Sequence, residues 1–478
     1  MKACWLFSVL VATLSASADA AIVAAPGYAV HLIPTPGSVQ GGVVRQGGAI
    51  LVGQGSFGAG SETVIRLDGG GSTTIATGFN SLGGFDLDDT GTLFVADNGG
   101  EQPGAATGDT LFSIPNALTR TSAVTAVGQE VVPKGTIPDA QDVLIAPGGA
   151  VLVSDATGFG AGRVVRVQGG VATNFLTGFD YTAGLALASD DTLFVGDVDS
   201  TTFEGSILRF GLDGTGHGGV ASGLAGTFDL VLDADGNVLV SGIHTPDFSD
   251  GMVLAIAPDG TVLQPPRADG FAFATGMFFD ATRDEVLVLD SGGTDIVAIC
   301  RERDGDGVCD ADDPCPAAVA TETLKIGKLD GPRGDTLKLA GEMTVPSFSP
   351  PPDPITNGAH LQLSGAAGTI LDVVIPGGAF SSGSHAGWKV NKAGTTWTYK
   401  NKAGLVGIVK VVVKTVGAPG TLQFVVIGKN GSFPVAPADL PLHAMMALDP
   451  TPSAGLCGEA IHTCSFNAKG NTLHCTSP

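Results

Sequence analysis

The sequence predicts an all-β protein in which a six-bladed β-propeller precedes a second β domain. The main observation is a repeat: a short apolar strand, ending in a small residue and usually a carboxylate, recurs six times. The copies read ILVGQ, LFVAD, VLVSD, LFVGD, VLVSG and VLVLD and begin at residues 50, 93, 151, 193, 238 and 286. Their spacings of 43, 58, 42, 45 and 48 residues match the length of one four-stranded blade. The 72 glycines supply the tight turns that join short strands.

The first twenty residues, MKACWLFSVLVATLSASADA, have the pattern of a secretory signal peptide. A lysine precedes a short apolar run, and small residues lead to an Ala-x-Ala cleavage site before Ala21. Neither this run nor any later stretch is long enough to span a bilayer. We therefore expect a secreted protein, either extracellular or located in the periplasm or at the cell surface. Cleavage removes Cys4 and leaves six cysteines, which indicates disulfides in an oxidising compartment but leaves their pairing open.

Residues 21–300 are predicted to form the propeller. Before the repeat strands lie further apolar runs with turns, such as GLALASDD at 184–191, and after them come third strands, such as SILRF at 206–210. The last blade stops after its third strand, DIVAI at 295–299, whereas YAVHLI at 28–33 precedes the first blade without a partner. YAVHLI is therefore predicted to complete the last blade and close the ring, which removes an exposed sheet edge. An open β-solenoid or sandwich is the alternative.

Over about residues 25 to 300 the chain resembles the NHL-repeat and SMP-30 (gluconolactonase-like) six-bladed propellers, whose blade pattern is an Asp-x-x-Gly turn followed by Φ-Φ-V-x-D. The resemblance implies a channel metal in lactonase-like members, held by Asn or Asp at the start of the innermost strands and by a Glu of the first blade. That position holds Asp142 and Asp229 in two blades and glycine in the others, Gly42, Gly84, Gly184 and Gly276. These glycines predict a wide channel mouth. Because the first-blade Glu is missing, a second divalent metal in the channel and a pair of solvated or turn-capping aspartates stay open as alternatives.

Two other features of the propeller bear on function. His244 lies two residues past its repeat strand, in the same blade as Asp229, and is a candidate general base beside a bound metal. A lone loop histidine that is only exposed is the alternative. The aspartates that end the repeat strands are predicted to be structural, because such side chains accept backbone N–H bonds in the turn that follows. They are Asp97, Asp155, Asp197 and Asp290. A catalytic role, suggested by their recurrence, is the alternative.

Residues 301–316, RERDGDGVCDADDPCP, form an acidic joint where the propeller ends. The pattern E-x-D-x-D-G-x-x-D-x-x-D-x-C-P closely resembles a thrombospondin type 3 repeat, a calcium-binding unit whose pattern begins with Asp. The resemblance implies a structural Ca²⁺ held by Glu302, Asp304, Asp306, Asp310 and Asp313. Calcium takes about six to eight oxygen ligands, so alternate side chains of a short loop must point inward, and Gly307 permits the sharp turn. A disordered acidic linker is the alternative.

The cysteines of the joint allow more than one pairing. Cys309 and Cys315 are six residues apart and could close the loop, with Cys300 as a competing partner. The charge balance also changes after the joint. Residues 21–321 contain 11 Lys and Arg against 37 Asp and Glu, a net charge of −26, whereas residues 322–478 have a net charge of +3.

Residues 317–478 are predicted to form a C-terminal β-sandwich with a disulfide-pinned tail, similar to tails of exported bacterial proteins. About seven antiparallel strands are expected, TLKIGKL, DTLKLAGEM, HLQLS, TILDVVI, TTWTYKNK, GIVKVVVKTV and TLQFVVIG. The tail is predicted to be a small cap pinned by Cys457, Cys464 and Cys475. A sugar-binding platform and a place in the core are alternatives for three aromatic residues, Trp388, Trp397 and Tyr399.

Two functions fit these observations. The first is a secreted calcium-binding propeller that acts as a scaffold for an extracellular ligand or partner, carbohydrate or protein. The second is a metal-dependent hydrolase, lactonase or lyase of the SMP-30-like class, with Asp142 and Asp229 as metal ligands and His244 as base. The missing first-blade Glu favours the first, and whether the protein is an enzyme stays open. The acidic surface disfavours nucleic acid and favours cations.

Overall fold

The computed structural model describes residues 22–56, 58–158, 160–244, 250–291, 293–302, 308–313, 315, 317–329, 334–344, 352–366, 368–417, 420–448 and 456–476. The predicted signal peptide therefore lies outside the described residues. The chain divides into two compact units, and the boundary lies between Cys300 and Arg301. Within the described ranges the regular elements are β-strands and one 3₁₀ turn, η2 (Pro437–Asp439), and no helix there is long and apolar enough to cross a membrane.

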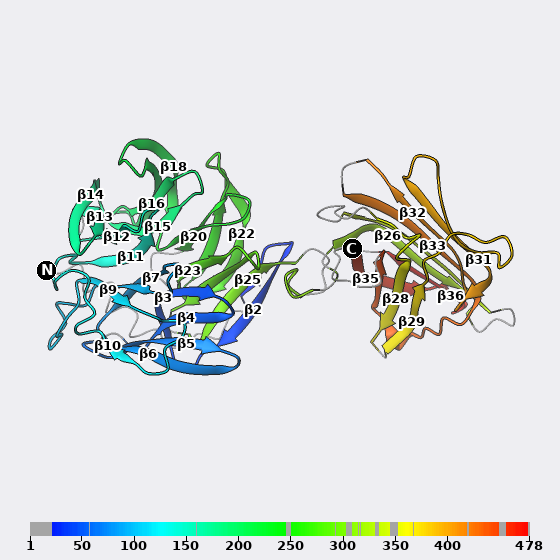
Figure 1. The fold of residues 1–478 in the computed structure, drawn as a ribbon, viewed down its shortest axis with the longest axis horizontal. Helices are drawn as coiled ribbons and strands as arrows, with labels where there is room; N and C mark the ends of the chain where they lie inside the picture. The colour runs from blue at the N-terminus through cyan, green and yellow to red at the C-terminus, as the bar shows by residue number, and fades with distance from the viewer. Residues whose placement is uncertain are drawn as a thin grey trace. The chain divides into compact units, whose positions relative to one another are not determined.

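The N-terminal unit is a six-bladed β-propeller, as the repeats predicted (Figure 1). The innermost strands are β3 (Val39–Gln46), β7 (Leu82–Leu87), β11 (Ala140–Ile145), β15 (Thr182–Leu187), β19 (Leu230–Leu232) and β23 (Ala274–Asp280). The six repeat strands are the second strands, β4 (Ala49–Gln54), β8 (Leu93–Asp97), β12 (Val151–Asp155), β16 (Thr192–Val198), β20 (Val238–Ile243) and β24 (Glu285–Asp290).

The outer strands follow in the same order. The third strands are β5 (Glu62–Asp68), β9 (Thr110–Ile114), β13 (Gly162–Gln168), β17 (Glu204–Gly211), β21 (Gly251–Ile256) and β25 (Asp295–Arg301). Fourth strands are β6 (Gly71–Phe79), β14 (Val171–Phe179), β18 (Gly216–Ala225) and β22 (Val262–Phe271), and β10 (Val124–Thr125) pairs with β6 in blade one. The described part of blade two has three strands.

The apolar runs of the repeat strands follow from where they lie. Strands β12 and β20 are buried along their whole length. Neighbouring blades cover both faces of a second strand, so its sequence is continuously apolar instead of alternating. Between blades one and two, for example, Phe79 and Phe112 pack edge to face with ring centroids 5.3 Å apart.

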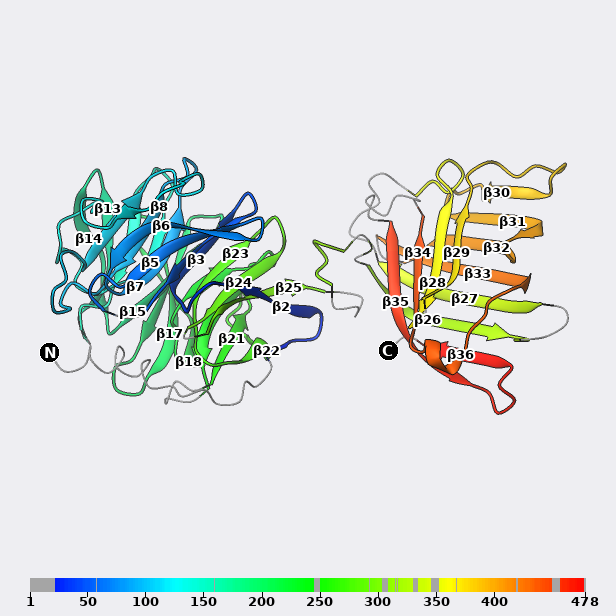
Figure 2. The same ribbon diagram turned by 90° about the horizontal axis from the view of Figure 1, so that it is seen from below.

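The N-terminal segment closes the ring. Strand β2 (Tyr28–Pro34) is hydrogen-bonded to β25 and completes blade six, so the prediction for YAVHLI is confirmed. Figures 1 and 2 both show β2, in dark blue, beside the green β25. The preceding β1 (Val23–Ala24) pairs with β22 of blade five, and the guanidinium of Arg267 lies 4.0 Å from the ring centroid of Tyr28. Residues from the start of the propeller therefore hold its last two blades.

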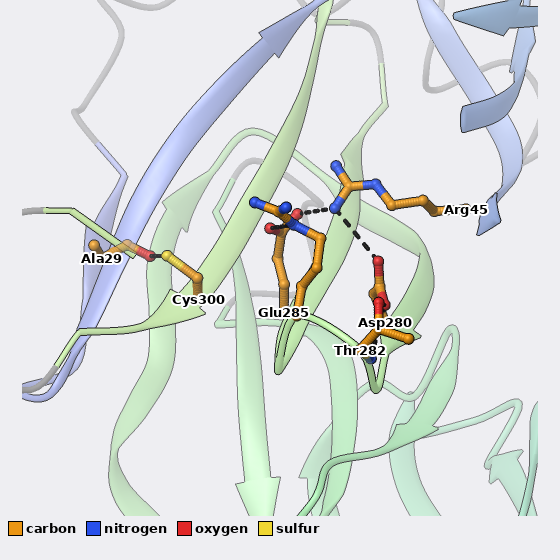
Figure 3. A network of polar contacts seen from close by, with 7 residues as sticks. Ala29, Arg45, Asp280, Thr282, Glu285 and Cys300 are labelled. Carbon is orange, nitrogen blue, oxygen red and sulfur yellow. Dashed lines mark hydrogen bonds and ion pairs between the residues drawn. The ribbon is translucent and has the colours of Figure 1, made fainter. Parts of the chain in front are cut away.

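Side chains strengthen the same closure (Figure 3). Nη1 of Arg45 on β3 lies 2.6 Å from Oε1 of Glu285 and 3.7 Å from Oδ2 of Asp280, both in blade six. Glu285 is buried, and its other oxygen, Oε2, lies 3.1 Å from Nε of Arg283, so two guanidinium groups balance its charge in a poorly solvated place. On the outer side of blade six, Sγ of Cys300 lies 3.7 Å from the carbonyl oxygen of Ala29 on β2.

The C-terminal unit is one curled sheet of eleven strands. Their spatial order is β29 (Gly368–Ile375), β28 (Ala359–Gly365), β34 (Leu442–Ala447), β35 (Cys457–Phe466), β36 (Thr472–Thr476), β26 (Ala317–Gly327), β27 (Asp335–Thr344), β33 (Thr421–Gly431), β32 (Ile408–Thr415), β31 (Thr396–Leu405) and β30 (Ala386–Val390). Figure 2 shows β28, β29, β34 and β35 running across the direction of the others. The change of direction occurs in β35, whose first half pairs with β34 and second half with β36. All seven predicted strands are present, but they belong to one continuous sheet, and the β-sandwich predicted for residues 317–478 is not confirmed.

The tail is part of this sheet and not a separate cap. Cys464 and Cys475 face each other across the β35–β36 pair and form a disulfide. Cys315 bonds to Cys457, 142 residues away, so the predicted loop closure by Cys309 and Cys315 is wrong. Cys300 and Cys309 each take part in a disulfide too.

The three C-terminal aromatic residues belong to the core. Trp388, Trp397 and Tyr399 are 1%, 8% and 2% exposed. Nε1 of Trp388 donates a hydrogen bond to the carbonyl oxygen of Pro376 at 3.0 Å, which satisfies its polar atom inside the unit. A sugar-binding platform made of these rings is therefore wrong.

Candidate functional site where the innermost strands meet

The glycines at the predicted channel position lie directly against the next blade. A Cβ at Gly84 would collide with the carboxyl of Asp142, and a Cβ at Gly184 would collide with the backbone of Asp229. A Cβ at Gly276 would meet the carbonyl oxygen of Gly41. Glycine permits this close approach of backbones. The expectation that these glycines line a wide mouth is wrong.

Asp142, on β11 in blade three, links its blade to blade four. Its Oδ1 accepts the N–H of Val143, and its Oδ2 accepts the N–H of Leu185 on β15, both at 2.7 Å. Its own N–H donates to Oγ of Ser154 at 2.9 Å. The side chain is only 8% exposed, so these bonds replace water around the carboxyl.

Asp229 repeats this arrangement between blades five and six. Its Oδ1 accepts the N–H of Leu230 at 2.7 Å, and its Oδ2 accepts the N–H of Met277 at 2.5 Å. Its own N–H donates to Oγ of Ser241 at 2.9 Å. Asp142 and Asp229, which the sequence analysis proposed as metal ligands, therefore also connect neighbouring blades by hydrogen bonds.

A third carboxyl of this kind was missed from the sequence. Asp86 on β7 accepts the N–H of Leu87 and, with its other oxygen, the N–H of Ile145 in blade three, both at 2.7 Å. The available signal was the tripeptide Phe-Asp-Leu, which occurs at 85–87 and again at 228–230 around Asp229. Asp86 joins blade two to blade three.

Asp142 and Asp229 converge although blade four separates them along the chain. The two carboxyls are close enough for each to affect the pKa of the other. Burial raises the pKa of Asp142 well above its usual range, and the charge of Asp229 raises it further. Burial likewise raises the pKa of Asp229. Two buried carboxyls that interact in this way cannot both ionise easily, so burial and charge repulsion disfavour the second ionisation of the pair.

The pair has donor atoms that fit a hard divalent cation. Each carboxyl oxygen accepts one backbone N–H and retains a further lone pair, and a cation between the two carboxyls would offset their mutual repulsion. The nearby Asp86 adds negative charge. The innermost strand of blade one has no glutamate; Glu62 is on β5, where Oε2 accepts the N–H of Leu82 at 2.5 Å. The ligand set is therefore smaller than the one that the family resemblance implies.

His244 follows β20 and has a carboxylate partner in its own blade. Its Nε2 lies 2.8 Å from Oδ1 of Asp269 on β22. The carboxylate of Asp250, which precedes β21, lies close to the same two groups. The ring is exposed, and its role as a general base stays a prediction.

The aspartates that end the repeat strands have the predicted structural role. Oδ1 of Asp97 accepts the N–H groups of Ser81 and Gly99, and Oδ2 accepts the N–H of Asn80. Asp155, Asp197 and Asp290 likewise accept N–H groups from the turn that enters the innermost strand of their own blade. The structural role is confirmed, but the predicted source of the donors is mostly wrong, because most of the N–H groups come from the turn before the innermost strand and not from the turn after the repeat strand.

Part of the predicted calcium loop is described. Glu302 is 8% exposed, the N–H of Asp310 donates to the carbonyl of Arg301 at 2.8 Å, and Oδ1 of Asp313 accepts the N–H of Cys315 at 2.7 Å. Two of the five predicted ligands, Asp304 and Asp306, lie outside the described residues. Calcium binding at this loop stays a prediction.

No protein family matches the chain, and no curated protein matches it either. Solved structures with a similar fold include regucalcin, a calcium-binding protein of Agrobacterium tumefaciens, 15% identical over 55% of this chain and 90% of that chain, with a TM-score of 0.38. A gluconolactonase of Xanthomonas campestris is 14% identical over 59% of this chain and 98% of that one, with a TM-score of 0.40. A Trichoderma reesei carbohydrate-active enzyme of family AA12 is 12% identical over 60% and 99%, with a TM-score of 0.43. This level of similarity shows neither activity nor ligand for this chain.

Proposed function

We propose that the protein is an exported propeller that binds an extracellular ligand or partner, carbohydrate or protein, and acts as a scaffold without chemistry of its own. The observation that supports this proposal is the use of the central carboxyls. All four oxygens of Asp142 and Asp229 accept backbone N–H groups, and one oxygen of each carboxyl accepts its N–H from the next blade, which is a structural task. The disulfides Cys315–Cys457 and Cys464–Cys475 suit an oxidising compartment.

A metal-dependent hydrolase, lactonase or lyase is the second candidate, and the convergence of Asp142 and Asp229 favours it. These residues would hold a divalent cation, which would polarise the carbonyl of a lactone. The test compares the wild-type chain with a double variant, Asp142→Asn and Asp229→Asn, and with a control at an exposed turn, Asp213→Asn. We expect no hydrolysis of a panel of sugar lactones by any of them and the same bound divalent metal in all three. If the wild type and Asp213→Asn hydrolysed a lactone, and the double variant lost both this activity and one bound metal ion, the protein would be a hydrolase and the scaffold proposal would be wrong.

The acidic joint is proposed to hold a structural Ca²⁺ through Glu302, Asp304, Asp306, Asp310 and Asp313. Without the cation these carboxylates repel one another, so the joint opens locally more often. We expect a calcium chelator to accelerate tryptic cleavage after Arg301 and Arg303 by roughly 10- to 100-fold, as expected when a bound ligand is removed.

Two matched variants make this calcium test specific. Asp310→Ala changes a predicted ligand and is expected to raise the cleavage rate without chelator, whereas Asp312→Ala changes a carboxylate outside the pattern and is expected to behave like the wild type. Cleavage rates are followed by mass spectrometry of the two fragments after the disulfides have been reduced. Equal rates with and without chelator would show that no calcium holds the joint.

A further inference from the structure

Three side chains of types that can bind a metal ion meet in blade five. They are separate in the sequence from the central carboxyls and from the acidic joint. His244 follows β20, Asp250 immediately precedes β21, and Asp269 is on β22. These three strands are neighbours in one sheet. Ile243 pairs with Gly251, so His244 and Asp250 flank one register position, and Met252 pairs with Asp269. Strand pairing therefore fixes where all three residues stand.

The side chains point toward one another. A ring nitrogen of His244, a carboxylate oxygen of Asp250 and a carboxylate oxygen of Asp269 all lie within 4.8 Å of each other. The Nε2 atom is 2.8 Å from Oδ1 of Asp269, and that oxygen also accepts the N–H of Gly270 at 2.7 Å. The backbone N–H of His244 donates to the carbonyl of Asp250 at 2.8 Å, which holds the loop ends together.

A histidine–aspartate ion pair alone does not explain this cluster. One neutral or singly charged imidazole faces two carboxylates, and the second carboxylate adds repulsion that a partner of higher positive charge would remove. The same chain contains the simpler arrangement: Nε2 of His360 lies 2.7 Å from Oδ1 of Asp372. Among the described residues, that pair is not part of a group of three potential ligands, whereas His244, Asp250 and Asp269 are.

We propose that His244, Asp250 and Asp269 form a binding site for zinc or a similar borderline divalent metal. An imidazole nitrogen suits Zn²⁺, Cu²⁺ or Ni²⁺, whereas Ca²⁺ and Mg²⁺ prefer oxygen ligands throughout. One nitrogen and two carboxylate oxygens are three of the four ligands of a tetrahedral zinc site. His244 is exposed and the two aspartates are half-buried, so the fourth position faces solvent and can take water or a donor group of a bound partner. This site goes beyond the proposed scaffold function and does not depend on it.

The test uses the full mature chain, freed of metal and then titrated with Zn²⁺ alone by calorimetry in the presence of excess Ca²⁺. Excess Ca²⁺ occupies oxygen-only sites, so the remaining high-affinity heat reports sites with nitrogen ligands. His244→Ala and Asp269→Asn are each expected to lose one equivalent of zinc or to weaken its binding by at least about 10- to 100-fold, the loss typical of a single supporting partner of a metal. His360→Ala is the matched control and is expected to bind zinc as the wild type does.

A second readout separates metal binding from folding. Cobalt(II) bound at a site with one nitrogen and few ligands gives a visible absorption band, which the wild type and His360→Ala should show and His244→Ala should lack. His244→Gln, closer in size to histidine, is used if the alanine variant has an altered circular dichroism spectrum. Three results would overturn the proposal. They are unchanged zinc binding in the His244 variants, loss of zinc binding when Ca²⁺ is added, and an equal fall in zinc binding in His360→Ala.

Discussion

Raising the pH from about 5 to 8 is expected to weaken the propeller, by roughly 3–5 kcal/mol in its free energy of unfolding. The cause is a set of buried carboxyls outside the central pair. Burial raises the pKa of Glu62 to about 7, that of Asp139 to about 7 and that of Asp86 to about 6. The folded state therefore binds these protons more tightly than the unfolded chain does. Their contribution is complete below the pKa values of the unfolded chain and is lost as the pH rises through the folded values.

Loss of propeller stability at low pH is expected to have a different cause. Hydrogen bonds from turn residues lower the pKa of several exposed aspartates. The stability that these aspartates contribute is present above the pKa values of the unfolded chain and is lost as the pH falls through the lowered pKa values of the folded state. Maximum stability of the propeller is therefore expected near pH 5.

Hydrogen-exchange mass spectrometry on peptides from residues 22–300 measures this stability directly. Tryptophan fluorescence would not, because Trp388 and Trp397 are both in the C-terminal unit. Glu62→Gln keeps the shape of the side chain and removes its titration, so it is expected to reduce the pH slope between 5 and 7. A propeller that is equally stable at pH 5 and 8, or more stable at 8, would contradict the prediction.

The propeller could be predicted because its information is local and repeated. Each repeat strand is an apolar run that neighbouring blades cover on both sides, and six copies at regular spacing leave few other architectures. The closure by β2 was also accessible, because Tyr28–Pro34 has strand character and the last blade lacked one strand. The structural role of Asp97 followed from its recurrence at one position of the repeat.

The remaining features depend on partners that are distant in sequence. The role of Asp86 depends on the N–H of Ile145, 59 residues away, and Cys315 finds its partner 142 residues further on. The glycines were misinterpreted because a missing side chain predicts either open space or close contact, and only the position of the next blade decides between them. Likewise, His244 alone carries no sign of Asp269, which strand pairing brings beside it.

Asp97→Ala is expected to destabilise the propeller by about 3–5 kcal/mol, among the largest effects of any single change in this unit. The side chain is fully buried and accepts the backbone N–H groups of Asn80, Ser81 and Gly99. Removing it leaves three amide donors without acceptors, and each buried unsatisfied group costs about 1–3 kcal/mol. Water that enters the space of the lost carboxyl can recover part of this cost.

The matched control for Asp97→Ala is Asp213→Ala, because Asp213 also accepts a turn N–H, that of Thr215 at 2.8 Å, but is exposed. Its loss is expected to change the stability of the propeller little, since water replaces the hydrogen bond. Hydrogen exchange on propeller peptides measures both variants, and protection should fall throughout the propeller for Asp97→Ala because the turn holds the entry to blade two. If the two variants were equally stable, the aspartates that end the repeat strands would not be structural, and a functional reason for their recurrence would have to be sought.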